Sequence, residues 1–207
     1  MPIIREYSLN GAEILLWHLC ETSDELQGIM VLTEEEANYL QKLNVEKRRA
    51  EWLCWHLMVR YYFDCEKVEI SYDSSGRPIL SDELNRQISV THGGNLVGII
   101  ISEKNCGIDI ESVNRNFSRV KNRYLSENEI QILSPLSGLA DVAAIGWCAK
   151  ECAFKIAKKD GIDFIKDFVI THSDYIDSTI YIDSSFGVKI KINVDIIDNH
   201  IICYSTR

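Results

Sequence analysis

The amino-acid sequence predicts an α+β fold built from two similar halves. Two long stretches, near residues 45–63 and 139–159, carry apolar residues at helical spacing. Each is followed by several short apolar or alternating stretches that indicate strands. The order of a long helix and then strands therefore occurs twice, at about 44–102 and 126–205, without evident sequence identity between the two copies. With 207 residues, 46% of them hydrophobic, the chain can bury one large core or two small ones.

The first half begins with a short apolar run at residues 14–19, which predicts a buried strand. Thr33 and Glu36 have the spacing of a capping box and predict a helix that reaches about Leu43. Asn44 is the candidate N-cap of the long helix that follows. Three more strands are expected at 68–72, 88–91 and 96–102, the last two joined by a turn at 93–95.

The second half begins with a strand at residues 106–111. Ser126 and Glu129 form a second candidate capping box. The long helix at about 139–159 is expected to stop before Gly161, a typical residue just beyond a helix end. Closing strands are expected at 169–172, 179–182, 188–192 and 200–205. We thus expect an N-terminal half, 1–102, and a C-terminal half, 103–207.

Charge and cysteine content narrow the class of protein. A formal charge of -9 argues against a general nucleic-acid binder, because phosphate neutralisation needs a basic face. The seven cysteines are odd in number and form no C-x-x-C pair, so we expect reduced thiols. The apolar run at 14–19 is too short to span a membrane and lacks the layout of a signal peptide. These observations predict a cytoplasmic protein that binds neither membrane nor nucleic acid.

Three carboxylates are candidates for a metal site. Asp109 and Glu111 are two residues apart in an apolar strand, so both side chains lie on one face. Oxygen ligands of this kind suit magnesium. Taken alone, the pair also fits a solvated strand face. Glu151 lies on the second long helix with Lys155 one turn later, which is also the spacing of an ordinary surface ion pair.

The motifs taken together, in this order, resemble those of the Sfp-type 4′-phosphopantetheinyl transferases. Two segments carry most of the likeness, GIDIE at 107–111 and WCAKECAFK at 147–155, and the T-H-G-G and G-R-P turns support it. The resemblance extends over about residues 44–170. It implies two pseudo-symmetric α/β halves, each a long helix packed on a small, mostly antiparallel sheet, with the active site in the cleft between them.

The resemblance also implies an activity. Such enzymes transfer the 4′-phosphopantetheine arm of coenzyme A to a serine of an apo carrier protein and release 3′,5′-ADP. By motif match, Asp109, Glu111 and Glu151 would hold Mg²⁺, and the C-terminal half would contain the magnesium site and the catalytic helix. Glu151 would also accept the serine proton, and Lys155 would stabilise the pyrophosphate. Lys150 belongs to the same motif without a clear role.

The N-terminal half would contact the nucleotide end of coenzyme A. His92, preceded by Thr91, matches a phosphate-binding histidine, and Arg77 matches a basic residue that binds the nucleotide. Arg48 and Arg49 match a basic helix start that faces the 3′-phosphate. Cations at a helix start oppose the helix dipole, which favours a bound anion there. The alternatives are a strand-end histidine satisfied by backbone and a solvated helix face.

The chain departs from the family pattern in three places. Thr91 replaces a common Ser, Cys152 replaces Ala or Ser, and Trp55 and His56 replace a Gly-Arg pair. The last change leaves open whether His56 takes over a coenzyme A contact.

The expected partner is an apo acyl or peptidyl carrier protein, and a monomer is expected because two halves in one chain complete a cleft. Either a docking surface or a solvated loop could explain four basic residues: Arg115, Arg119, Lys121 and Arg123. Tyr124 and Leu125 could add an apolar contact or belong to the core. Two other functions stay open, a magnesium-dependent nucleotide phosphohydrolase and a non-catalytic coenzyme A-binding relative.

Overall fold

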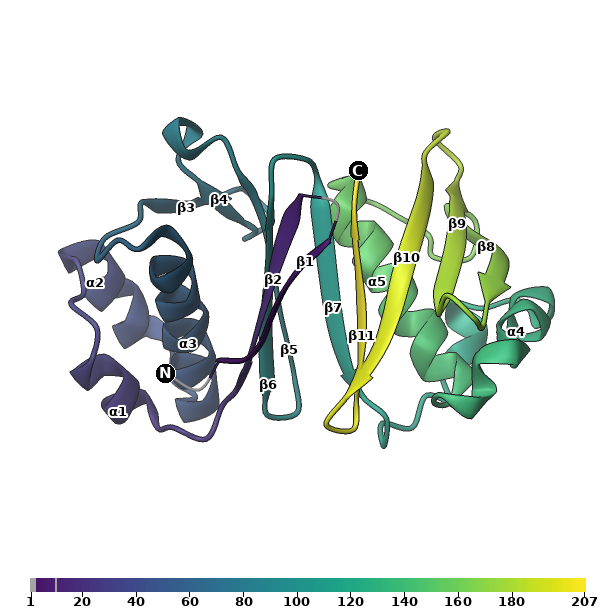
Figure 1. Ribbon diagram of the computed structural model, residues 1–207, viewed down its shortest axis with the longest axis horizontal. Helices are drawn as coiled ribbons and strands as arrows, with labels where there is room; N and C mark the ends of the chain where they lie inside the picture. Colours follow the sequence, from purple (N-terminus) through teal and green to yellow (C-terminus); the bar gives the residue numbers. More distant parts are fainter. Residues whose placement is uncertain (1–2, 10) are drawn as a thin grey trace. The chain divides into compact units, whose positions relative to one another are not determined.

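The computed structural model describes residues 3–9 and 11–207, which form two compact units. Unit 1 is Met1–Glu103 and unit 2 is Lys104–Arg207. Each unit combines helices with an antiparallel sheet, so the predicted α+β class is confirmed (Figure 1).

Unit 1 contains a four-stranded sheet in the order β1-β2-β6-β5, with all neighbours antiparallel. These strands are β1 (Ile3–Leu9), β2 (Ala12–His18), β5 (Gln87–Gly93) and β6 (Leu96–Ser102). A small second sheet pairs β3 (Ile70–Tyr72) with β4 (Pro78–Leu80), and a 3₁₀ turn, η1, covers Asp82–Leu84. The helices are α1 (Ser23–Gly28), α2 (Glu34–Lys42) and α3 (Glu46–Phe63).

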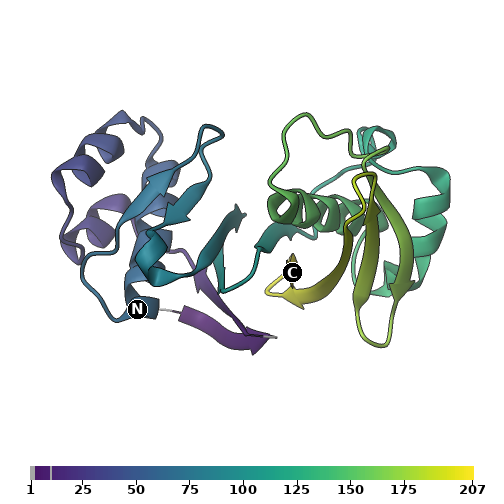
Figure 2. The same ribbon diagram turned by 90° about the horizontal axis from the view of Figure 1, so that it is seen from above.

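The core of unit 1 lies between α3 and its sheet. Residues 50–60 of α3 are all buried, as expected for a helix covered on several sides. Leu53 and Met58 of this helix belong to the same apolar cluster as Trp17 of β2 and Ile99 of β6. Figure 2 shows α1, α2 and α3 gathered on one side of this sheet.

Unit 2 contains a five-stranded antiparallel sheet in the order β7-β11-β10-β9-β8. The strands are β7 (Cys106–Ser112), β8 (Phe168–Asp174), β9 (Thr179–Ser184), β10 (Lys189–Ile197) and β11 (His200–Thr206). The helices are α4 (Glu127–Leu133) and α5 (Val142–Ala157), with 3₁₀ turns η2 (Lys121–Arg123) and η3 (Ser134–Gly138). Helix α5 lies along one face of the sheet and packs mainly on β7 and β11 (Figure 2).

Two predicted capping boxes are confirmed, at Thr33 and at Ser126. The prediction that Asn44 caps the long helix is wrong, because Val45 occupies the N-cap of α3 and offers no side-chain hydrogen bond. The second long helix starts later than predicted: residues 134–138 form a 3₁₀ turn, and Asp141 caps α5. It also ends earlier, because Lys158 adopts the left-handed conformation (φ 50°) that we expected near Gly161.

One helix and two strands were not predicted: the short helix α1 and the strands β1 and β4; the 3₁₀ turns η1, η2 and η3 were not predicted either. The strand expected at 68–72 begins only at Ile70. No single helix within the described residues is long and apolar enough to cross a membrane. One bent pair, Glu127–Gly138 with Val142–Ala157, passes the same test by length and composition only.

Candidate active site

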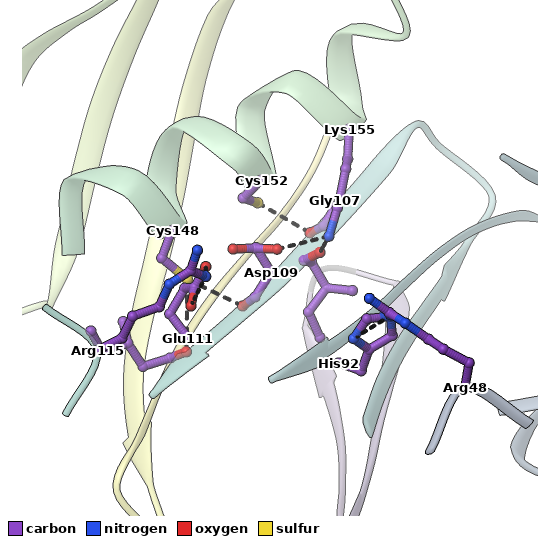
Figure 3. A network of polar contacts seen from close by, with 11 residues as sticks. Arg48, His92, Gly107, Asp109, Glu111, Arg115, Cys148, Cys152 and Lys155 are labelled. Atoms are coloured by element: carbon purple, nitrogen blue, oxygen red, sulfur yellow. Dashed lines mark hydrogen bonds and ion pairs between the residues drawn. The ribbon is translucent and has the colours of Figure 1, made fainter. Parts of the chain in front are cut away.

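The packing of α5 on β7 places the motif residues of unit 2. A methyl group at Gly107 would lie 2.5 Å from the backbone oxygen of Cys152 and 2.7 Å from Cγ1 of Ile156. Only a residue without Cβ lets the helix approach this closely. The thiols of Cys152 and Cys148 donate to the carbonyls of Gly107 and Asp109, at 3.2 and 3.3 Å. Helix and strand are therefore held at a fixed register (Figure 3).

Asp109 lies on β7 against the last turns of α5 and is 7% exposed. The ammonium of Lys155 donates to Oδ1 of Asp109 and to the carbonyl of Ile108, both at 2.8 Å (Figure 3). Burial by itself would lower the pKa of Lys155, but the charge and hydrogen bond of Asp109 raise it above its usual value. Lys155 is thus a charged group directed at the β7 carboxylate, not the surface partner of Glu151.

Glu111 follows on the same face of β7 and is also 7% exposed, so the alternative of a solvated strand face is wrong. Nη1 of Arg115 contacts both carboxylate oxygens of Glu111, at 2.6 and 2.7 Å (Figure 3). Burial raises the pKa of Glu111, and Asp109 adds to this, while hydrogen bonds from Arg115 and Trp147 oppose it. The net rise means that its negative charge is not fully compensated.

Glu151 is half-buried on α5, one turn before Lys155. Burial raises its pKa to about 7, and the charges of Asp109 and Glu111 add to the rise, with Lys155 and Arg115 opposing it. Asp109, Glu111 and Glu151 therefore form one electrostatically coupled group. Within it, three acidic side chains repel one another in a partly desolvated place.

The chemistry of this group fits a hard divalent cation, since all its donors are carboxylate oxygens. The three side chains are not already arranged around one metal position. Among residues 3–9 and 11–207, no group of three His, Cys, Asp or Glu side chains is placed to hold a metal ion. The near cations are Lys155 on Asp109 and Arg115 on Glu111. Magnesium commonly takes only one or two protein carboxylates and completes its shell with water and phosphate.

In unit 1, the start of α3 and the end of β5 form a second charged cluster. Nη1 of Arg48 lies 2.6 Å from Nε2 of His92, and Nδ1 of His92 lies 3.6 Å from the buried carboxylate of Glu51 (Figure 3). Arg48 itself reaches Glu51 at 3.2 Å. Since Arg48 can only donate, Nε2 accepts and the proton of His92 sits on Nδ1, toward Glu51. This places two predicted phosphate contacts, Arg48 and His92, together.

The other predicted residues of unit 1 lie in different settings. Arg49 is half-buried on α3, and its Nε has no hydrogen-bond partner among the described residues. Thr91 is only 5% exposed on β5. Arg77 stands in the β3–β4 turn, where its N–H donates to Asp73. His56 is buried in α3, with its ring 3.6 and 3.7 Å from those of Trp52 and Trp55, so it belongs to the core.

Comparison with known families gives a direct result for unit 2. Residues 105–204 match the sequence profile of the 4'-phosphopantetheinyl transferase superfamily. Through this unit, the chain belongs to that superfamily. A search of curated proteins found no match. The match contains both the strand that carries Asp109 and Glu111 and the helix that carries Glu151 and Lys155, and it supports phosphopantetheine transfer as the general reaction of this superfamily member.

Several important partners were missed by sequence reasoning. Glu51 is one, although its spacing of three and four from Arg48 and Lys47 was a usable signal. Arg115 was considered only as part of a docking surface or a solvated loop, although it stands four residues after Glu111, with which it pairs. The question left open for Tyr124 and Leu125 is settled, since both are core residues, 1% and 2% exposed. Lys150 proves to be fully buried.

Proposed function

We propose that this transferase moves the 4′-phosphopantetheine arm of coenzyme A to a serine of an apo carrier protein, with Mg²⁺, and releases 3′,5′-ADP. One observation supports this most strongly. The acidic residues of the superfamily-matched strand, Asp109 and Glu111, face the helix that carries Glu151 and Lys155, across a seam held by Gly107 and Lys155. Acidic oxygens and one directed ammonium are what a pyrophosphate-cleaving site requires.

Each of the four site residues of unit 2 is assigned a role in this proposal. Asp109, Glu111 and Glu151 would hold the magnesium ion, which would neutralise charge on the pyrophosphate. Glu151 also accepts the serine proton, directly or through water, since a serine hydroxyl is a weak nucleophile at neutral pH. The serine oxygen then forms a bond to the phosphorus of the arm, and the bond from that phosphorus to 3′,5′-ADP breaks. Lys155 stabilises the departing phosphate charge.

In unit 1, we propose that Arg48, Arg49, Arg77, Thr91 and His92 contact the nucleotide end of coenzyme A. The Arg48–His92 contact supports this for two of them. Val45 leaves the start of α3 without a side-chain cap, so its N–H groups and the nearby cations suit an anion. The monomeric state, the carrier partner and the cytoplasmic location remain predictions.

The competing function is a magnesium-dependent phosphohydrolase that uses the same carboxylates with water as the nucleophile. Intact-mass analysis separates the two. The protein, coenzyme A and Mg²⁺ are incubated with a panel of apo carrier proteins. Transfer adds the mass of the arm to a carrier and forms 3′,5′-ADP only when a carrier is present. Release of 3′,5′-ADP at the same rate without carrier would contradict transfer.

Two substitutions assign the roles of the carboxylates. Asp109→Ala should abolish transfer by weakening metal binding. Glu151→Gln should lower turnover by about 10²-fold or more with little change in coenzyme A affinity, because the base is lost. Glu127→Gln, an exposed glutamate in the first turn of α4, is the matched control and should transfer normally. Near-normal turnover of Glu151→Gln would exclude it as the base.

Arg48→Ala tests the nucleotide contact. We expect the KM for coenzyme A to rise about tenfold, because a charge-assisted phosphate contact is lost, with kcat changing little. Steady-state kinetics with coenzyme A varied measures this. Arg86→Ala, which removes an arginine paired with Glu103 on another part of unit 1, is the control. An unchanged KM for Arg48→Ala would remove this residue from the site.

A further inference from the structure

Lys150 is a charged residue in the interior of unit 2. It is 0% exposed, although it precedes the half-buried Glu151 on α5. Its ammonium donates to the carbonyls of Tyr124 at 2.7 Å and Phe164 at 2.8 Å, and lies 2.6 Å from Oε1 of Glu129. An ammonium has three donors, and each has an acceptor here. Lys150 is thus directed into the protein and does not contact a substrate.

The acceptors of Lys150 come from three separate segments of the chain. Tyr124 follows the basic loop after β7, Phe164 lies in the loop between α5 and β8, and Glu129 belongs to α4. Glu129 is itself fixed, since its other oxygen accepts from Ser126 and Oε1 accepts the N–H of Ile170 on β8 at 3.0 Å. One ammonium therefore ties α5 to two loops, to α4 and through it to β8.

The opposite side of the same helix is tied to β7. Cys148, Cys152 and Lys155 donate to three successive carbonyls of that strand, those of Asp109, Gly107 and Ile108. Lys150 holds the far side of α5, together with the hydrogen bond from the Tyr124 hydroxyl to the carbonyl of Ala143, and both contacts oppose a roll of α5 about this line. With side-chain tips about 5–6 Å from the helix axis, a roll of about 10° moves the tip of Glu151 by about 1 Å. Catalytic groups tolerate about 0.5 Å before activity falls.

We propose that Lys150 is a positioning residue: its buried ammonium sets the rotation of α5 and so places the Glu151 carboxylate relative to Asp109 and Glu111. This inference rests on the proposed function for its kinetic consequence. The placement of Glu151 relative to Asp109 and Glu111 is inferred from the geometry alone and does not depend on the proposed function.

The test removes the ammonium without leaving a buried charge behind. Lys150→Met alone would strand the Glu129 carboxylate and could unfold unit 2. The double variant Lys150→Met/Glu129→Gln is therefore used, because glutamine keeps the capping box of α4. Lys150→Gln/Glu129→Gln replaces it should methionine prevent folding. Lys166→Met, an exposed lysine, is the control. Glu129→Gln alone keeps Lys150 and its two carbonyl contacts but removes the paired carboxylate, so it measures what the loss of Glu129 contributes to the double variant.

The first readout is kinetic. In the folded double variant, kcat for carrier modification should fall at least about tenfold, while the KM for coenzyme A stays within about twofold. If Lys150 had only a structural role, its substitution would lower the fraction of folded, active protein and leave kcat per folded molecule unchanged. A double variant with wild-type kcat per folded molecule would overturn the proposal.

The second readout is independent of catalysis. Binding of Mn²⁺ to the protein without coenzyme A is followed through the electron paramagnetic resonance signal of free Mn²⁺. We expect the double variant to bind Mn²⁺ at least about fivefold more weakly than wild type and Lys166→Met to bind it normally. Glu129→Gln, which keeps the ammonium, should bind more tightly than the double variant. If the wild type binds Mn²⁺ more tightly than the double variant but transfers no arm to any carrier, the proposed function is overturned and the positioning role is supported. Equal Mn²⁺ binding by all variants, or none by the wild type, would overturn the positioning role.

Discussion

His56 is a titratable residue that is buried in an apolar core. Its ring lies between those of Trp52 and Trp55, and Nδ1–H donates to the carbonyl of Trp52 at 2.8 Å. Burial lowers the pKa of His56 to about 3, the backbone hydrogen bond opposes this, and Arg60 adds to it. The ring is therefore neutral in the folded protein at all physiological pH values.

This low pKa predicts an acid-sensitive core. The unfolded chain takes up the His56 proton near pH 6.5, while the folded chain does so only near pH 3. Stability is thus lost as pH falls between these values, at no more than about 1.4 kcal/mol per pH unit. Between pH 7 and pH 5, wild type should lose about 2 kcal/mol more than His56→Phe, measured by urea unfolding. His172→Phe, at an exposed position on β8, is the control. Equal slopes for wild type and His56→Phe would contradict the prediction.

At the scale of elements, the seam between α5 and β7 depends on Gly107. The nearest atom to an added Cβ is a backbone oxygen, which cannot move away as a flexible side chain can. Gly107→Ala should therefore lower the free energy of unfolding by about 1–3 kcal/mol, through the strain of an overpacked contact. Gly28→Ala is the control, because no heavy atom lies within 4 Å of its added Cβ. Equal urea midpoints for the two variants would show that α5 does not approach β7 this closely.

At the scale of the molecule, a net charge of -9 opposes the approach of an acidic carrier protein. The exposed basic residues of the loop after β7 would then have to provide local attraction. We expect Arg119→Glu to raise the KM for the carrier about tenfold and to leave the KM for coenzyme A unchanged. Lys189→Glu, with the same charge change at an 84% exposed side chain on β10, is the control. The wild-type KM for the carrier should also rise with salt, because the Debye length is about 8 Å at 0.15 M.

Local signals predicted much of this architecture. Capping boxes at Thr33 and Ser126 and the apolar period of α3 depend on neighbouring residues, so they are visible in the sequence. Strand β1 and the start of α5 depend on tertiary pairing and on a 3₁₀ turn, which leave little local trace. For the site, spacing suggested that Asp109 and Glu111 share a face of one strand, and the resemblance to a family gave the proposed roles of Asp109, Glu111, Glu151 and Lys155. Neither could show that Lys155 turns to Asp109, or that Lys150 points inward, since both follow from the rotation of α5.

Because some cysteines are exposed and others are buried, their rates of alkylation can report local unfolding of the protein. Cys20 and Cys65 are exposed, whereas Cys54 in unit 1 and four cysteines of unit 2 are buried: Cys106, Cys148, Cys152 and Cys203. A thiol reagent added to the native protein meets the two exposed sulfurs at once. The others become reactive only when the structure around them opens. Peptide masses after timed alkylation would thus give opening rates for α3 and for the α5–β7 seam separately, from one sample and without any introduced label.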